Sequence, residues 1–215
     1  MKLSHRLLLS LFALGSLPAL ALSDASRSRL EHIQSRWAEV NYQLPAKQRE
    51  SAFADLAQLA ASAVSAEPAA AELRVWHGIV LGTYAGAKGG LGALDLVKQA
   101  KAELEQAITL DAKVLGGSAY TSLGSLYYQV PGWPLGFGDD AKAEALLKQA
   151  FALNPNGIDP NYFYGDFLLR QKRYKEAKIF LDNTLTAADR PGRAIADEGR
   201  RAETRALLKV VQEKL

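Results

Sequence analysis

The chain has 215 residues, 48% of them hydrophobic and 23% charged, which predicts a folded core and excludes a chain that is disordered throughout. It has 26 basic and 23 acidic residues, and two of the basic ones, Lys2 and Arg6, lie in an N-terminal segment that we expect to be removed. The near-neutral remainder argues against a nucleic-acid partner, because phosphate binding needs a clustered positive excess. The lack of cysteine excludes disulfides, thiolate metal sites and a cysteine nucleophile.

Residues 1–21 have the layout of a secretory signal peptide. A basic start with Lys2 and Arg6 precedes an apolar run from Leu7 to Leu14, and the segment ends in Ala19-Leu20-Ala21. We expect cleavage after residue 21. The mature chain, residues 22–215, should then form a single domain in the periplasm. In the alternative, an uncleaved segment would hold the protein at the membrane, but this run is shorter than the ~20 apolar residues of a spanning helix.

Residues 23–44 and 45–65 predict two amphipathic helices that form an N-terminal hairpin. Pro45 favours the start of the second helix, and Glu67-Pro68 ends it. In both helices the apolar residues recur at intervals that place them on one face. These positions are Leu30, Ile33, Trp37 and Val40 in the first helix, and Phe53, Leu56, Ala60 and Ala63 in the second.

Three helix pairs are predicted next, over residues 69–112, 118–155 and 158–189, because one spacing of small and large residues recurs. The second copy reads Tyr120, Leu123, Gly124, Tyr127, Ala143, Leu147 and Ala150; the third has Tyr164, Gly165, Leu168, Ala177 and Leu181; the first has Leu81, Gly82, Ala100, Leu104 and Ala107. This spacing matches the tetratricopeptide (TPR) template. With a charged capping helix over residues 193–215, the sequence predicts an all-α solenoid of about three degenerate TPR-like pairs.

The connections inside two of the pairs are longer than the template. From the glycine of the first helix to the first alanine of the second there are 12 residues in the third pair, but 18 in the first and 19 in the second. Insertions at equivalent places fall on one edge of an array, which is often the binding edge. The second insertion contains Trp133 and Phe137, and these aromatic side chains either plug the repeats or form a partner surface.

The first helix of each pair usually faces the concave side of such an array. On this register, that side would carry Trp76, Thr83, Ser118, Thr121, Ser125, Tyr128, Asp159, Tyr162 and Asp166. Asp159 also has a simpler interpretation as a helix N-cap. The predicted binding site for a partner or small polar ligand combines the concave side with the loop, and its residues are Trp76, Thr121, Tyr128, Trp133, Phe137, Tyr162 and Asp166.

Enzyme signatures are scarce in this sequence. After the signal segment only His32 and His77 remain, neither in an H-E-x-x-H pattern, and there is no G-x-S-x-G elbow. We therefore predict a protein without catalytic residues, metal or cofactor; a hydrolase or lyase that uses His77 with a nearby carboxylate is the least favoured alternative. The arginines from Arg190 to Arg205 alternate with acidic residues, which predicts a solvated, salt-bridged helix face.

Residues 71–185 resemble the T-component proteins associated with TRAP (tripartite ATP-independent periplasmic) transporters. The matching segments are Lys88-Gly89-Gly90, residues 104–111, residues 120–124, residues 131–139 and Leu153-Asn154-Pro155. The resemblance implies degenerate helical repeats around a groove or pore, and docking with a periplasmic solute-binding protein. That family is typically anchored through a signal-peptide cysteine, which this chain lacks. The expected function is that of an exported adaptor; the alternative is a periplasmic small-ligand carrier without a protein partner.

Overall fold

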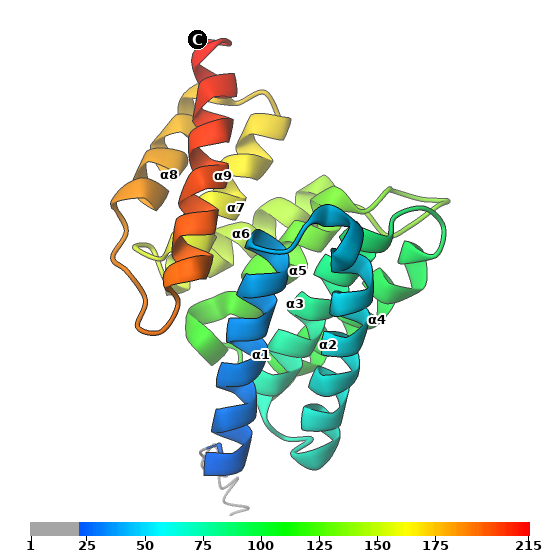
Figure 1. Cartoon of the computed structure of the whole chain (residues 1–215). Coiled ribbons are helices and arrows are strands. Elements are labelled where there is room, and N and C mark those ends of the chain that lie inside the picture. Colours follow the sequence, from blue (N-terminus) through cyan, green and yellow to red (C-terminus); the bar gives the residue numbers. More distant parts are fainter. Residues whose placement is uncertain (1–21) are drawn as a thin grey trace, which may run out of the picture.

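The computed structural model describes residues 22–215, which fold into nine α-helices and one short 3-10 helix, η1 (Val114–Gly117) (Figure 1). The predicted signal peptide lies outside the described residues. The helices are α1 (Asp24–Tyr42), α2 (Ala46–Ala66), α3 (Ala71–Lys88), α4 (Ala93–Leu110), α5 (Ser118–Gln129), α6 (Asp140–Leu153), α7 (Ile158–Arg170), α8 (Tyr174–Thr186) and α9 (Ala194–Gln212). In this range no helix has the length and apolar character needed to cross a membrane.

Two of the predicted helix pairs pack around the glycine and leucine that the sequence pattern singled out. A methyl group on Gly124 of α5 would lie 2.9 Å from Cγ of Leu147 in α6, and one on Gly165 of α7 would lie 2.8 Å from Cγ of Leu181 in α8. Distances this short leave no room for a side chain, so glycine permits the two helix axes to approach closely. The prediction of an all-α array of helix pairs is confirmed.

The first pair has the same contact, but one helical turn earlier than predicted. A methyl group on Gly78 would lie 2.7 Å from Cγ of Leu104 in α4, whereas Gly82 faces Cδ2 of Leu126 in α5. Gly78 is therefore the equivalent of Gly124, and the predicted register of this repeat, based on Gly82, is wrong. Because α3 carries both glycines one turn apart, spacing alone did not distinguish the one inside the pair from the one that faces the next pair.

The array closes on itself. Consecutive pairs contact each other in chain order, α9 packs against α7 and α8, and α9 also contacts α1 (Figure 1). At this last contact the ring of Tyr42, at the end of α1, lies directly against Gly199 of α9. The Tyr42 hydroxyl donates to a carboxylate oxygen of Glu203 over 3.4 Å. The C-terminal helix, predicted as a cap, thus also joins the end of the array to its start.

One continuous hydrophobic core runs through the array. It receives fully buried side chains from the N-terminal hairpin and from all three pairs, among them Ile33, Phe53, Leu73, Leu104, Leu147, Phe167 and Leu181. In α9, Leu208 and Val211 are buried, whereas Ile195 in its first turn is exposed. Since the first helices of the pairs face one another across the closed array, the space between them becomes the candidate site.

Candidate functional site: a cavity inside the closed array

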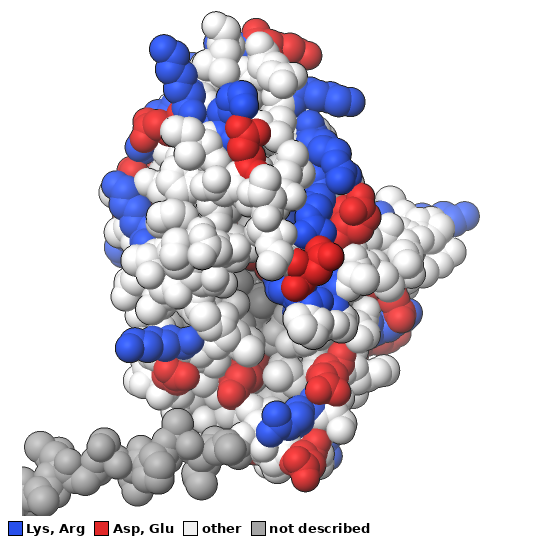
Figure 2. Space-filling view, turned by 90° about the vertical axis from the view of Figure 1, so that its left-hand side faces the viewer, with Lys and Arg blue, Asp and Glu red and all other residues white. Residues whose placement is uncertain are grey.

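A cavity of about 950 Å³ lies between the first helices of the pairs. Its walls come mainly from α1, α3, α5, α7 and α9, with single residues or short stretches of α2, α4, η1 and the loops before α7 and α9. The space-filling view shows the surface hollowed near the middle of the molecule, with basic and acidic side chains beside the hollow (Figure 2). A volume of this order is at the upper end of the range for small-molecule sites in proteins.

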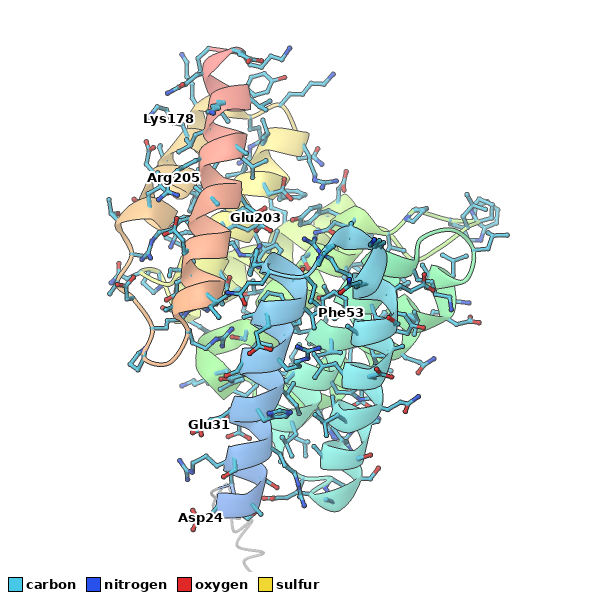
Figure 3. All side chains as sticks on the ribbon, in the orientation of Figure 1. Asp24, Glu31, Phe53, Lys178, Glu203 and Arg205 are labelled. Carbon is cyan, nitrogen blue, oxygen red and sulfur yellow. The ribbon has the colours of Figure 1, made fainter. Side chains whose placement is uncertain are left out.

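One wall of the cavity is aromatic. The rings of Trp37 and Trp76 meet edge to face, with 5.8 Å between their centroids. Nε1 of Trp37 donates to the Thr83 hydroxyl over 3.0 Å, which fixes the orientation of its ring. Phe53 of α2, labelled in Figure 3, also lines the cavity. The guanidinium of Arg193 lies 4.8 Å above the Trp76 ring, in cation–π contact.

Another part of the wall is charged and centres on Asp159. Its carboxylate accepts from Nη1 of Arg190 over 2.6 Å and from Nε of Arg200 over 3.1 Å. Burial alone would raise the pKa of Asp159, but the charges of these two arginines outweigh it and lower the pKa to about 2. Arg200 also pairs with Glu203 over 2.6 Å, and Arg190 with the buried Asp197 over 2.6 Å. The network therefore ties α7 to the loop before α9 and to α9 itself.

Two interpretations of the charged residues are wrong. Asp159 does not cap α7: Gly157 stands at the N-cap, and the Asp159 carboxylate turns to the arginines instead. The arginines from residue 190 onward do not form one solvated face, because Arg190, Arg193 and Arg200 line the cavity. Charge alternation along the sequence favours a solvent-facing stretch, but the loop before α9 folds back over the start of α7.

The side of α9 that faces the cavity could have been recognised from the spacing of its polar residues. Its buried polar residues, Asp197, Arg200 and Thr204, continue the stripe of Leu208 and Val211 at intervals of three or four. Opposite sides of α9 differ accordingly: Glu203 is directed toward α1, whereas Arg205 lies on the outer side (Figure 3). Hydrophobic periodicity read only from apolar side chains overlooked this polar continuation of the buried stripe.

A second polar cluster joins α5 to α7. The Tyr128 hydroxyl donates to Oδ2 of Asp166 over 2.8 Å, and Arg170 approaches the same oxygen at 3.3 Å. Burial and the neighbouring Asp166 charge raise the pKa of the Tyr128 phenol, so this hydroxyl stays protonated and keeps donating. Nearby, burial raises the pKa of Tyr162 to about 12, although the Arg200 guanidinium 4.3 Å above its ring opposes the shift.

The structure brings together only part of the predicted site. Trp76, Thr121, Tyr162 and Asp166 line the cavity, and Tyr128 lies behind Asp166. Trp133 and Phe137 do not line it and belong to the loop between α5 and α6. The predicted site therefore divides into two separate surfaces. Among the cavity residues absent from the predicted site are Trp37, which the sequence assigned to the core, and Arg190, Arg193 and Arg200, which it assigned to a solvated helix face.

The loop of residues 131–138 presents its two aromatic side chains in opposite ways. Phe137 is half-buried, with its ring 5.4 Å from that of Tyr127, whereas Trp133 is 90% exposed. The loop is held at its base, where the Asp139 amide donates to the Tyr127 carbonyl over 2.9 Å. The Asp139 side chain caps α6 by accepting from the Lys142 amide. Phe137 thus plugs the repeat, while Trp133 is presented to solvent.

His77 does not line the cavity. Its Nδ1 lies 3.4 Å from a carboxylate oxygen of Glu103 in α4, and Arg74 pairs with the other oxygen over 2.8 Å. His77 precedes Gly78 as Leu123 precedes Gly124, so it occupies a packing position inside the helix pair. Across residues 22–215, no three potential metal-binding side chains gather into a cluster.

Comparisons with known proteins agree with this architecture. Residues 135–197 match the family model described as tetratricopeptide repeat. The matched segment contains α6, α7 and α8, which belong to the array of stacked helix pairs. Similar solved structures include MamA, with 21% identity, a TM-score of 0.44 and coverage of 78% of this chain and 92% of that one. Another is a thermophilic TPR protein of Thermus thermophilus, with 18% identity, a TM-score of 0.39 and coverage of 82% and 99%. No curated protein sequence matches the chain.

Proposed function

We propose that this protein is an exported, non-catalytic adaptor that docks a periplasmic partner protein through the projecting loop of residues 131–138. The observation that carries the proposal is the exposure of Trp133, at 90%, and Leu135, at 65%, on a loop fixed at its base. Exposed tryptophan is costly to keep in water, and tryptophans are enriched among the residues that dominate protein interfaces.

The anchoring of the loop supports a docking role. Gly138 donates from its amide to the Pro131 carbonyl over 3.0 Å, so the two ends of the loop are joined. Phe137 packs inward at the same time, and Lys101 of α4 lies 5.9 Å above its ring. A loop ordered before binding loses little conformational entropy when a partner covers it. The partner class that the TRAP T-component resemblance implies is a periplasmic solute-binding protein.

Site-specific photo-crosslinking in the native host tests this proposal. A photoreactive phenylalanine at position 133 should yield a crosslinked product in the periplasmic fraction, and mass spectrometry should identify a solute-binding protein in it. Ile179 of α8 is the matched control, because it is also exposed, at 60%, but lies outside the loop. Equal products at both positions, or none at 133, would contradict the docking surface, and a cytoplasmic protein would contradict export.

The cavity favours a second candidate function, a carrier of a small ligand. Its volume of about 950 Å³ is within the range of small-molecule sites, and α9 and α1 contact each other beside it. Native mass spectrometry of residues 22–215, purified gently from the host, should then show an added small mass. Substitution of both Tyr162 and Asp166 in the wall should remove that mass without unfolding the chain; an unchanged mass would place the ligand elsewhere.

A further inference from the structure

Some of the charged side chains around the cavity have ion-pair partners and others do not. Five arginines and four carboxylates line it. Every one of these carboxylates has an arginine partner: Asp159 pairs with Arg190 and Arg200, Asp166 with Arg170, Asp189 with Arg201, and Glu203 with Arg200. None of the four is thus left as a free negative charge to attract a cationic ligand.

Arg193 differs from the other cavity arginines. Among the described residues its guanidinium has no carboxylate within ion-pair distance, and its buried Nε has no hydrogen-bond partner. Arg49 also lacks a carboxylate, but its Nε donates to the Leu44 carbonyl over 2.9 Å. A buried donor without a partner lowers the stability of the folded state, and more so when it is charged. Arg49 and Arg193 are therefore the cavity arginines without a carboxylate at ion-pair distance, and Arg193 is the one whose buried Nε also lacks a hydrogen-bond partner, although Asp159 and Asp197 act on its charge from farther away.

The surroundings of Arg193 favour an incoming anion. Burial and the neighbouring Arg190 charge lower the pKa of Arg193, although a guanidinium remains protonated at neutral pH. Arg193 also stands at the N-cap of α9, where the unpaired amides of the first turn favour negative charge. A carboxylate placed against the guanidinium would stabilise its positive charge, and its own negative charge would be favoured by these amides.

The same guanidinium lies on an apolar platform. It is 4.8 Å above the Trp76 ring, and Trp37 continues the aromatic wall. We propose that the cavity binds a small organic carboxylate, whose charged end pairs with Arg193 and whose hydrophobic body lies against Trp76 and Trp37. One unpaired guanidinium beside apolar walls suits a monocarboxylate better than a phosphate, which carries more charge and needs more donors.

Tryptophan fluorescence tests this proposal, which rests on the small-ligand role of the cavity and not on the docking loop. The chain has three tryptophans, and Trp133→Phe removes the exposed one, so that Trp37 and Trp76 report from the cavity wall. In this background 4-phenylbutyrate should cause a saturable change. 4-Phenylbutyramide, which has the same body without the charge, and acetate, which has the charge without the body, should each bind about tenfold more weakly or worse.

Arg193→Gln should weaken 4-phenylbutyrate binding about 10- to 100-fold, because it removes a charge-assisted hydrogen bond. Arg205→Gln is the matched control on the outer side of α9 and should leave the affinity unchanged. Arg193→Lys, which keeps the charge, should bind better than the glutamine variant, and circular dichroism should show that all three variants are folded.

The outcomes distinguish two claims: that the cavity binds a small ligand, and that this ligand is a carboxylate held by Arg193. Equal binding of the acid and the amide, or an unchanged affinity in Arg193→Gln, would overturn the carboxylate assignment while leaving the cavity as a ligand site. No saturable response to any of the three probes, together with no small mass retained by the native protein, would overturn both.

Discussion

The interfaces inside the helix pairs and the interface between α1 and α9 that closes the array consist of different types of residue. Inside the pairs, glycines such as Gly124 and Gly165 meet leucines at distances that leave no room for a methyl group. At the closure, the aromatic ring of Tyr42 packs against Gly199, and its hydroxyl donates to the charged side chain of Glu203. The glycine and leucine of a helix pair come from two neighbouring helices, whereas the hydrogen bond at the closure joins residues 161 apart in the chain.

We expect the interfaces inside the helix pairs to provide most of the stability, and the interface between α1 and α9 to control access to the cavity. Apolar burial contributes roughly 25 cal/mol per Å² without requiring exact charge partners, so the pairs provide most of the stabilising free energy. Ion pairs that are partly exposed contribute little net free energy, because desolvation offsets their attraction. We therefore expect substitutions in the pairs to unfold the chain, and substitutions at the closure to loosen α9 from α1 with less effect on the whole.

The largest expected effect comes from Leu147→Ala. Leu147 is fully buried against Gly124, so its truncation removes buried surface and leaves a cavity, which should lower the free energy of unfolding by about 2–5 kcal/mol. Leu135→Ala removes the same atoms from a side chain that is 65% exposed and should change stability by less than about 0.5 kcal/mol. Urea denaturation measures both; similar losses for the two variants would contradict the assignment of the core.

Acid should weaken the charged wall by a smaller amount. The folded-state pKa of Asp159 is about 2, below its ordinary value of 3.8, so its contribution is present above pH 4 and is lost as the pH falls toward 2. The shift corresponds to about 2 kcal/mol. Because other carboxylates titrate in this range, the measurement is the stability difference between the parent protein and Asp159→Asn at several pH values. That difference should shrink on acidification; a constant difference would contradict the Asp159–arginine pairing.

Three alanine substitutions at helical glycines compare the interfaces directly. Gly165→Ala forces a methyl group against Leu181 and should cost about 1 kcal/mol net, since overpacking exceeds the gain in helix propensity. Gly86→Ala has open space around it and should stabilise α3 by up to about 1 kcal/mol. Gly199→Ala pushes against the Tyr42 ring, a side chain that can move, and should lower stability less than Gly165→Ala does.

Gly199→Ala also tests whether the closure controls access to the cavity. A loosened α9 should increase the quenching of Trp37 and Trp76 by iodide in a Trp133→Phe background, because both rings lie in the cavity wall. Gly165→Ala, measured under conditions where it remains folded, is the control and should leave quenching unchanged. If Gly199→Ala instead destabilises the chain as strongly as Leu147→Ala, the closure is part of the cooperative core.

The smallest expected effect is that of Tyr42→Phe. It removes only the hydroxyl that donates to Glu203 over 3.4 Å, a long hydrogen bond, and keeps the ring against Gly199. The loss should be below about 0.5 kcal/mol, since hydrogen bonds between partly exposed groups contribute little net free energy. Thermal unfolding next to Tyr42→Ala, which also removes the ring, separates the two contributions; equal losses would place the whole effect in the hydroxyl.

Much of the fold could be predicted from the sequence because the helix pairs are local. The spacing of Gly124 and Leu147, and of Gly165 and Leu181, sits within segments short enough for one pattern to define both partners. The same pattern correctly put the first helices on the concave side, where Trp76 and Thr121 now line the cavity. It failed at Gly82 because a helix with two suitable glycines gives two registers that only packing against Leu104 distinguishes.

The sequence by itself determined the class of fold and some residues of the cavity wall, such as Trp76 and Thr121, since helical periodicity and small-residue spacing are read over a few tens of residues. The tertiary structure decided the rest: that α9 returns to α1, that Arg190 and Arg200 turn inward to Asp159, and that Arg193 reaches Trp76. Charged side chains follow no short-range pattern that reveals their partners. Their pairing depends on which helix ends meet in space, and this is settled only when the array closes.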